Sequence, residues 1–327
     1  MSARNQRDGH VLALSGGVGG AKLALGLARI LPPGKLTVVA NTGDDFEHLG
    51  LRISPDLDTL TYALAGLDDR ERGWGRAEET WTFMRALTSL GGENWFQLGD
   101  ADLALHVERT WRLRTGFTLT EVTDHIRRTL GIASRLLPMS DDPVSTRVET
   151  DEGWLDFQDY FVRRRCEPVV RKVAFVGAER ARAHTEMLAM LRDPALRAVV
   201  LCPSNPFVSI EPILAIMGVR EMLRDCPVPV VAVSPIIGGK AVKGPTAKMF
   251  AELGLEPSAR AVAERYRDFL DAYVVDEADA GMTPPEGVAI VPEKTLMLSL
   301  EDRDRVARAV LAAADAVSGK APDGDRG

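Results

Sequence analysis

An apolar run that gives way to four glycines constrains the fold of this chain more than any other stretch. Residues 11–14 are predicted to form a buried strand and residues 22–31 a helix. Between them lie Gly16, Gly17, Gly19 and Gly20. Glycines permit a tight turn and a close approach of the backbone to a ligand, and free N–H groups at a helix start attract anions. The order of strand, glycine turn and helix therefore predicts a phosphate-binding turn.

Two well-known phosphate-binding motifs do not fit this turn. A dinucleotide fingerprint that starts at Gly17 requires glycine at the position of Lys22. A Walker A motif that starts at Gly16 requires Gly-Lys-Ser/Thr where residues 21–23 are Ala-Lys-Leu. The chain is therefore predicted to be neither a nicotinamide enzyme nor a P-loop NTPase. Such a turn can also serve only to pack a strand against a helix, and the sequence leaves that alternative open.

The length, charge and cysteine content of the chain exclude several classes of protein. Its 327 residues suffice for one α/β domain with an insertion, or for two domains. A net charge of -7 and a pI of about 5.4 argue against nucleic acid or an anionic membrane as the main partner. The three cysteines are unclustered, which indicates neither a disulfide framework nor a zinc site. No apolar run approaches the ~20 residues that span a bilayer, and no signal-peptide core is present, so a soluble, cytoplasmic protein is predicted.

Acidic residues follow the second predicted strand, residues 36–40. The loop Asn41-Thr-Gly-Asp-Asp contains Asp44, and a second acidic cluster contains Asp56 and Asp58. Ligands of parallel sheets bind beyond the carboxyl ends of the strands, so these carboxylates are expected beside the glycine turn, where they could hold a divalent cation. Asp58 could alternatively be the N-cap of the helix that follows it.

The rest of the chain predicts an α/β fold with a mostly parallel sheet between helices and one insertion. Residues 67–168 are rich in amphipathic helices and tryptophan, and predict a mostly helical cap over the crevice. Residues 1–66 and 169–318 form the predicted core, and residues 319–327 a disordered tail. Two further loops at strand ends, residues 203–210 and 234–245, carry hydroxyls, amides and glycines that suit a diphosphate or a base.

The predicted chemistry needs no protein nucleophile. The sequence has no Ser-His-Asp order, no G-x-S-x-G elbow and no His or Cys metal motif. Phosphoryl or nucleotidyl transfer fits such a site, because positioning and charge neutralisation by Mg²⁺ supply most of the catalysis.

Six ordered motifs resemble the 2-phospho-L-lactate transferase family, over residues 11 to 314. They are Ser15-Gly-Gly-Val-Gly-Gly, Asn41-Thr-Gly-Asp-Asp, Ser54-Pro-Asp-Leu-Asp-Thr, Leu137-Pro-Met-Ser-Asp-Asp-Pro-Val-Ser-Thr, Pro203-Ser-Asn-Pro and Ser234-Pro-Ile-Ile-Gly. The resemblance implies a Rossmann-like three-layer core, a homodimer and a requirement for Mg²⁺. It also implies transfer of phospholactate, or of its enolpyruvate or glycerate equivalent, from a GDP-activated donor to the ribityl hydroxyl of the deazaflavin Fo. GMP is released, and the step belongs to coenzyme F(420) biosynthesis.

The resemblance also implies roles for individual residues. Asp44 and Asp58 would be the catalytic and metal-binding carboxylates, and Asp58 and Gln97 would contact Fo. The guanosine diphosphate part would be bound by Gly16, Gly17, Gly19, Gly20, Lys22, Asn41, Ser204, Asn205, Ser234, Gly238 and Lys243. Gln97 and Ala101 depart from the family pattern, which often has basic residues there. Whether Asp58 is a general base or a ligand and orienter stays open, as does the identity of the donor acid.

Two rival functions remain. The first is a nucleotide-sugar-binding regulatory protein of the gluconeogenesis-factor type, which shares the glycine-rich start. The second is a nucleotidyltransferase that uses GTP directly and releases pyrophosphate.

Overall fold

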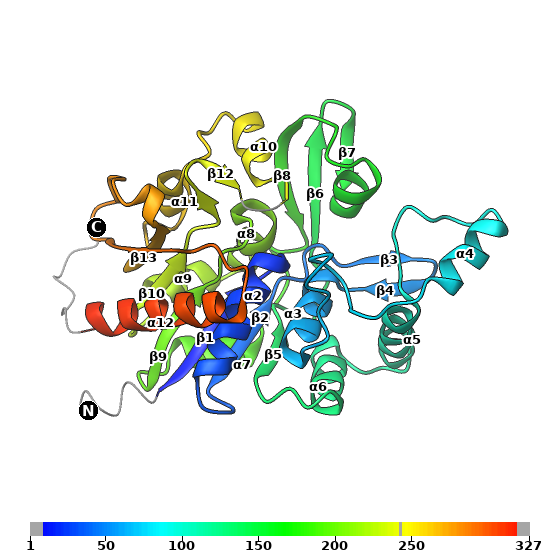
Figure 1. Ribbon diagram of the computed structural model, residues 1–327, viewed down its shortest axis with the longest axis horizontal. Coiled ribbons are helices and arrows are strands. Elements are labelled where there is room, and N and C mark those ends of the chain that lie inside the picture. The colour runs from blue at the N-terminus through cyan, green and yellow to red at the C-terminus, as the bar shows by residue number, and fades with distance from the viewer. Residues whose placement is uncertain (1–8, 242–243, 319–327) are drawn as a thin grey trace.

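The computed structural model describes residues 9–241 and 244–318, and its centre is a seven-stranded sheet (Figure 1). The strand order is β14-β13-β10-β9-β1-β2-β5, and every neighbouring pair is parallel. The strands are β1 (His10–Ser15), β2 (Leu36–Ala40), β5 (Arg135–Pro138), β9 (Leu196–Leu201), β10 (Val230–Val233), β13 (Ala272–Asp276) and β14 (Ala289–Glu293). This architecture confirms the predicted α/β, Rossmann-like fold with a mostly parallel sheet. The predicted disordered tail lies outside the described residues.

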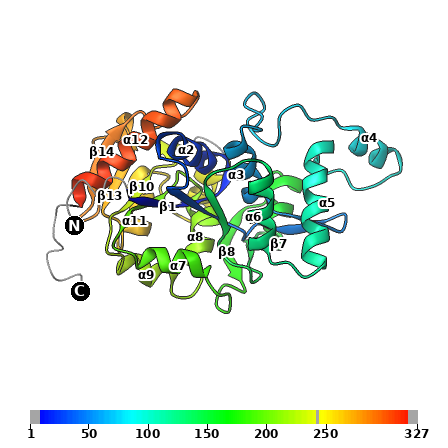
Figure 2. The same cartoon turned by 90° about the horizontal axis from the view of Figure 1, so that it is seen from below.

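Helices cover both faces of the central sheet, which gives three layers (Figure 2). One face carries α2 (Gly17–Ile30), α3 (Pro55–Ala65) and α12 (Leu300–Val317), and the other carries α7 (Thr185–Leu191), α8 (Glu211–Leu214), α9 (Val219–Arg224) and α11 (Ala259–Tyr266). Side chains alternate along β1, so that Leu12 and Leu14 pack into one apolar core and Val11 and Ala13 into the other. Strands buried on both faces are apolar throughout, which explains why they could be recognised in the sequence.

The segment between β2 and β5 contains a hairpin before α3, and after α3 it contains the helices in the first half of the insertion. The elements are β3 (Phe46–His48), β4 (Leu51–Ile53), α4 (Thr82–Ser89), α5 (Asp100–Arg114) and α6 (Leu119–Thr129). The hairpin, α4 and α5 project to one side of the main body (Figure 1). Ile53 of β4, Met84 of α4 and Leu98 form a small apolar core that is separate from the two main ones. Helix α6 begins at a capping box, in which the Thr118 hydroxyl accepts from the Glu121 N–H.

The predicted helical cap over residues 67–168 is wrong in its second half. Strand β5 lies within that range but belongs to the central sheet. Strands β6 (Ser145–Thr150) and β7 (Gly153–Asp156) pair antiparallel with each other, and β6 also pairs with β8 (Val170–Val176). Strand β8 therefore belongs to this separate three-stranded sheet and not to the central one. The sequence of β6 alternates exposed and buried residues, which is typical of a sheet with one solvated face.

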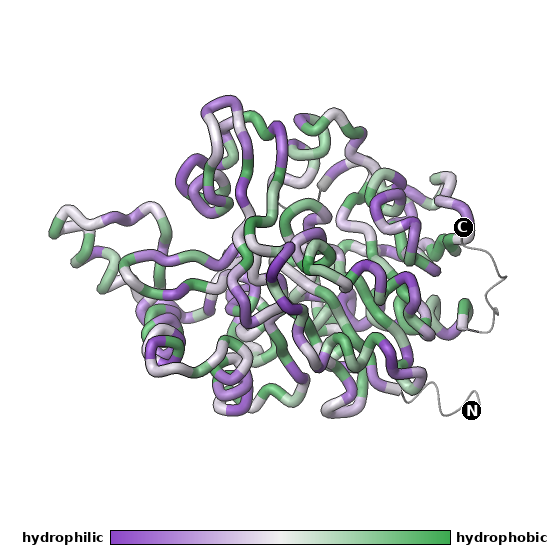
Figure 3. The backbone as a smooth tube through the Cα atoms, turned by 180° about the vertical axis from the view of Figure 1, so that it is seen from behind, coloured by the Kyte–Doolittle hydropathy of each residue, from purple (hydrophilic) through white to green (hydrophobic). Residues whose placement is uncertain are grey.

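The remaining elements are short. They are η1 (Asp159–Arg163), η2 (Pro206–Ile210), β11 (Ile236–Ile237), β12 (Lys240–Ala241), α10 (Thr246–Glu252) and η3 (Glu277–Asp279). Apolar residues run along the strands and helices in the middle of the molecule (Figure 3). None of the helices that the structure describes is long and apolar enough to cross a membrane.

Candidate functional site

The order of the central strands reverses between β1 and β9, and this is where the glycine turn lies. The chain runs from β1 outward to β2 and β5, and then returns to β9 on the other side of β1. The loops after β1 and β9 are joined, because the Gly16 N–H donates to Ser204 Oγ at 3.1 Å and Ser204 Oγ donates to the Gly16 carbonyl at 2.8 Å. Ligands of open parallel sheets bind at such a reversal point. The turn is therefore at the mouth of the sheet, as its sequence predicts.

The glycines form the first turn of α2, rather than a loop that ends at residue 22. Gly17 has φ +63°, a conformation that favours glycine, and its N–H donates to Asp56 Oδ1 at 2.6 Å. A Cβ on Gly19 would lie 2.5 Å from the Pro203 carbonyl oxygen, and one on Gly20 would clash with the hydroxyls of Ser15 and Ser204. Close packing therefore requires these glycines, and the helix start already holds one protein carboxylate.

A cavity of about 650 Å³ opens over the carboxyl ends of the central strands. Seven of the predicted nucleotide-binding residues line it: Gly16, Gly17, Gly19, Lys22, Ser204, Asn205 and Ser234. Asp44, Asp58 and Gln97 line it as well. The structure thus brings most of the predicted site residues to one cavity.

The other predicted nucleotide-binding residues lie elsewhere. Gly20 is packed against the Ser15 and Ser204 hydroxyls, and Asn41 is fully buried behind the cavity wall. Gly238 has φ +54° in the turn between β11 and β12, and its N–H donates to Asp279 Oδ2 at 2.9 Å. These residues shape the site rather than line it. Lys243 lies outside the described residues.

Asn41 holds the two acidic loops together. Its Nδ2 donates to Asp44 Oδ1 at 3.1 Å and to Asp56 Oδ2 at 2.9 Å, and its Oδ1 accepts from the Gly43 N–H at 2.8 Å. Asp44 Oδ2 also accepts from Gln158 Nε2 at 3.2 Å. The amide therefore fixes two carboxylates beside each other.

Burial raises the pKa of three carboxyls in this cluster. Burial first, and then the charge of Asp56, holds the pKa of Asp44 well above its usual value. Burial raises the pKa of Asp56 to about 6, opposed by hydrogen bonds from Asn41 and Gly17. Burial raises the pKa of Asp45 to about 8, opposed by a hydrogen bond from Ser54. A cation at this position would favour the charged forms of these groups.

The chemistry of this cluster fits Mg²⁺, which prefers oxygen ligands. Among residues 9–241 and 244–318, no three His, Cys, Asp or Glu side chains are grouped so as to hold a metal ion. Mg²⁺, however, usually binds through one or two carboxylates together with substrate phosphates. Asp44 and Asp56, joined through Asn41, supply such carboxylates next to the glycine turn.

Asp58 is bound by an arginine of the insertion. The N-cap of α3 is Ser54, so Asp58 lies in the first turn and the N-cap alternative is wrong. Arg109, on α5, donates from Nη1 to Asp58 Oδ2 at 3.2 Å and from Nη2 to Oδ1. No local pattern in the sequence indicates this pair, because the two residues are 51 positions apart. Asp58 faces the cavity, but its role as a metal ligand stays a prediction.

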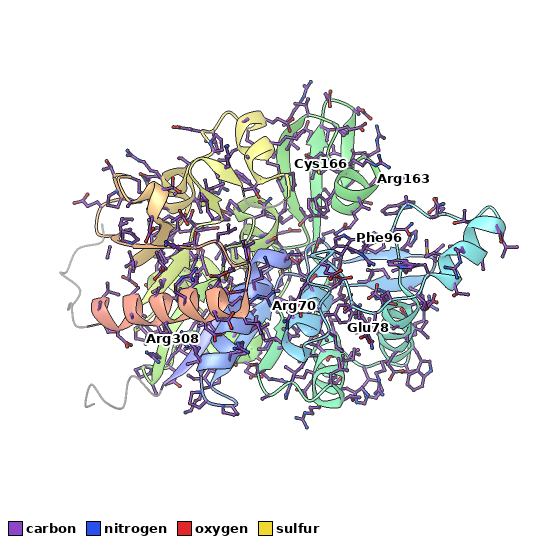
Figure 4. All side chains as sticks on the ribbon, viewed as in Figure 1. Arg70, Glu78, Phe96, Arg163, Cys166 and Arg308 are labelled. Carbon is purple, nitrogen blue, oxygen red and sulfur yellow. The ribbon has the colours of Figure 1, made fainter. Side chains whose placement is uncertain are left out.

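The insertion supplies an aromatic wall. Trp74, Trp95 and Phe96 line the cavity, although tryptophans more often lie in a core. The Arg72 guanidinium lies 5.1 Å from the ring centre of Trp74. Phe96 packs edge-on against Phe46 of β3, with ring centres 4.9 Å apart. Figure 4 labels Phe96 on the side of the molecule where the hairpin projects. Flat rings on one wall suit an aromatic ligand.

Comparison with known proteins gives a consistent result. Residues 11–289 match the family model described as 2-phospho-L-lactate transferase CofD. A phosphoenolpyruvate transferase of Kitasatospora aureofaciens is 40% identical over 318 residues, which cover 94% of this chain and 98% of the relative. A 2-phospho-L-lactate transferase of Methanosarcina mazei is 43% identical over 269 residues, which cover 82% and 88%. A solved structure of a UPF0052 family member from Bacillus halodurans has a TM-score of 0.61 at 14% identity, covers 93% of this chain and 99% of its own, and shows a shared fold.

Proposed function

The chain belongs to the 2-phospho-L-lactate transferase family, and we propose that it moves a phosphorylated three-carbon acid from a GDP-activated donor to the deazaflavin Fo. In this reaction the terminal ribityl hydroxyl of Fo attacks the phosphorus next to the acid, a phosphodiester forms and GMP leaves. The product is the precursor to which glutamate is added in coenzyme F(420) biosynthesis. We further propose that the enzyme uses Mg²⁺ and works as a cytoplasmic homodimer.

The observation that carries this proposal is that one cavity has two chemically different walls. The core wall combines the start of α2 with Lys22, Ser204 and Asn205, groups that suit a nucleoside diphosphate. Other lining residues are the aromatic rings of the insertion, which suit a flat tricyclic acceptor. Asp44, Asp56 and Asp58 line the same cavity, and we place the phosphorus of the donor and the hydroxyl of the acceptor beside them.

Asp58 is placed to orient the acceptor hydroxyl. The Arg109 guanidinium donates to both oxygens of the carboxylate and so fixes its plane. Each oxygen retains lone pairs that can accept a hydrogen bond from the attacking hydroxyl. Asp44 and Asp56 would hold Mg²⁺, which when bound neutralises charge on the phosphates. Positioning then supplies most of the rate enhancement.

The proposal leaves the donor acid to experiment. Relatives named phosphoenolpyruvate transferase and relatives named 2-phospho-L-lactate transferase are almost equally similar to this chain, at 40% and 43% identity. Purified protein, Fo and Mg²⁺ should be incubated with the GDP-activated lactate, enolpyruvate and glycerate donors in separate tubes. Mass spectrometry should find the phosphodiester and GMP in at least one tube, and EDTA should abolish product.

Two outcomes would favour the rivals. If no tube contains product and the fluorescence of Fo shows no binding, the regulatory nucleotide-binding function becomes the better explanation. If GTP alone supports a reaction that releases pyrophosphate, the protein is a nucleotidyltransferase. Sedimentation at micromolar concentration tests the homodimer separately.

The variant Asp58→Asn tests the role of the carboxylate. It should lower turnover by about 10²-fold or more, because the amide accepts hydrogen bonds less strongly than a carboxylate. Its loss of charge also leaves Arg109 buried without an ionic partner, so a melting temperature several degrees below wild type is expected. Wild-type turnover by a folded Asp58→Asn protein would show that the carboxylate has no part in the reaction.

A further inference from the structure

One face of α5 carries three polar residues into the cavity region. Asp102, His106 and Arg109 are spaced by four and three positions, which places them on the same side of the helix. Asp102 and His106 line the cavity, and Arg109 lies directly behind Asp58. The insertion therefore presents a polar stripe, as well as aromatic rings, to the reaction centre.

Arg109 is held from several sides, so that its guanidinium has one orientation. Only 3% of the residue is exposed. In addition to the two oxygens of Asp58, its Nη1 contacts the Arg52 carbonyl oxygen and His106 Nδ1, each at 3.3 Å. A guanidinium only donates, so Nδ1 of His106 accepts and the ring proton lies on Nε2. Nε2 is 3.2 Å from Asp102 Oδ2, and Asp102 Oδ1 accepts from the Tyr62 hydroxyl.

These contacts connect α5 with α3, although His106 Nε2 approaches Asp102 without making a hydrogen bond. Tyr62 and Asp58 both belong to α3, whereas Asp102, His106 and Arg109 belong to α5. The Asp58 carboxylate is thus bound by the two nitrogens of the Arg109 guanidinium. The other contacts of this guanidinium are with the Arg52 carbonyl oxygen and His106 Nδ1. A two-point contact fixes the plane of a carboxylate, which a single point charge does not.

We propose that Arg109 is a positioning residue that sets the orientation of the Asp58 carboxylate toward the acceptor hydroxyl. The role rests on the proposed function, because the attacking hydroxyl is the group that Asp58 must meet. Burial alone would lower the pKa of Arg109, but the charge of Asp58 and its hydrogen bonds raise it. Arg109 also forms a contact between the insertion and the core, because it lies on α5 and binds Asp58 of α3.

The test compares Arg109→Lys and Arg109→Met with Arg112→Met. Arg112 lies on the same helix, pairs with Glu108 and does not line the cavity, so it is a matched control. Arg109→Met should lower kcat by about 10²-fold while KM for donor and acceptor changes less than about 3-fold, because misplacement affects the reacting geometry rather than binding. Arg109→Lys keeps the charge but loses the fork, and should recover only part of kcat.

A double variant distinguishes positioning from a general loss of structure. If Arg109 acts through Asp58, kcat of Asp58→Asn/Arg109→Met should be no lower than that of Asp58→Asn alone. A lowered kcat in protein that stays folded at the assay temperature, with KM little changed, supports the role. A lower melting temperature is expected in addition, because Asp58 loses its buried ionic partner. If Arg109→Met does not fold, the test is made with Arg109→Lys. A lower kcat with little change in KM then supports the positioning role, and a wild-type kcat contradicts it.

The outcomes separate this inference from the proposed function. Wild-type kcat in a folded Arg109→Met protein, or equal losses for Arg109→Met and Arg112→Met, would overturn the positioning role and leave the transferase reaction intact. Independent, multiplicative losses in the double variant would also overturn it. Absence of turnover by the wild-type protein with all three donors would overturn the proposed function, and the positioning role with it.

Discussion

The substitution Asn41→Asp tests how the acidic cluster is held together. Asn41 is fully buried, and its Nδ2 donates to Asp44 Oδ1 at 3.1 Å and to Asp56 Oδ2 at 2.9 Å. The change preserves shape and keeps an acceptor for the Gly43 N–H. It replaces the donor, however, with an oxygen that faces two carboxyls.

The cost of this change follows from the distances. Two unit charges about 3 Å apart repel by roughly 5 kcal/mol at an effective dielectric constant of 20. The introduced carboxyl avoids that repulsion by keeping a proton in the folded protein, so its folded pKa is raised above the unfolded value of about 3.9. Keeping the proton costs about 1.4 kcal/mol for each pH unit above that value, up to about 5 kcal/mol at pH 8, where Asp56 with its pKa of about 6 is ionised. At pH 5.5 that neighbour is largely protonated, and the cost is at most about 2 kcal/mol. Stability relative to wild type should therefore fall as the pH rises.

Chemical unfolding of both proteins at pH 5.5 and pH 8 measures this difference. Asn205→Asp is a suitable control, because the Oδ1 that accepts from the Phe207 N–H is retained and the other contact of the amide is a methionine sulfur at 3.8 Å. We expect that control to change stability by less than about 0.5 kcal/mol at either pH. If Asn41→Asp and wild type show the same dependence on pH, the Asn41 nitrogen does not face Asp44 and Asp56, and the reasoning fails.

Two further predictions concern the scaffold. Gly19→Ala should lower the free energy of unfolding by about 1–3 kcal/mol, because the added Cβ would lie 2.5 Å from a backbone carbonyl, whereas Gly281→Ala meets no atom within 4 Å. Equal melting temperatures for the two variants would contradict the close approach. Asp302→Asn should remove about 1 kcal/mol near neutral pH, since Asp302 accepts from the Ser299 N–H in the capping box of α12. These hydrogen bonds lower the folded pKa of Asp302, so the difference from wild type should be present above about pH 4 and disappear as the pH falls below it. A difference that persists at low pH would assign the loss to another cause.

The central sheet was predictable because its strands are apolar and bounded by distinctive loops. Residues 11–14 and 36–40 have the pattern of buried strands, and both lie in the parallel sheet. Because ligands bind beyond the carboxyl ends of parallel strands, the sequence alone predicts that Gly16, Asp44 and Ser204 lie close together. The structure confirms that these residues line one cavity.

The features that the sequence does not predict depend on contacts between distant residues. The β6 strand has the alternating pattern of a half-exposed strand, but its partner β8 follows some twenty residues later, and no local feature joins them. The predicted start of α2 at residue 22 is too late because glycine has a low helix propensity, whereas tertiary packing against Pro203 makes the glycines necessary. Arg109 could be suspected only from its spacing with Asp102 and His106, which is equally typical of a solvated helix face.

The distribution of charge explains why the insertion and the core must act together. The core supplies Asp44, Asp45, Asp56 and Asp58 within a short stretch, and burial raises the pKa of the first three. Asp58 is the member of this cluster that binds a buried arginine, and the insertion supplies that arginine. A core without α5 would leave Asp58 among like charges and without the guanidinium that binds both of its oxygens. On the proposed role of Arg109, the insertion therefore fixes the direction in which the Asp58 carboxylate points.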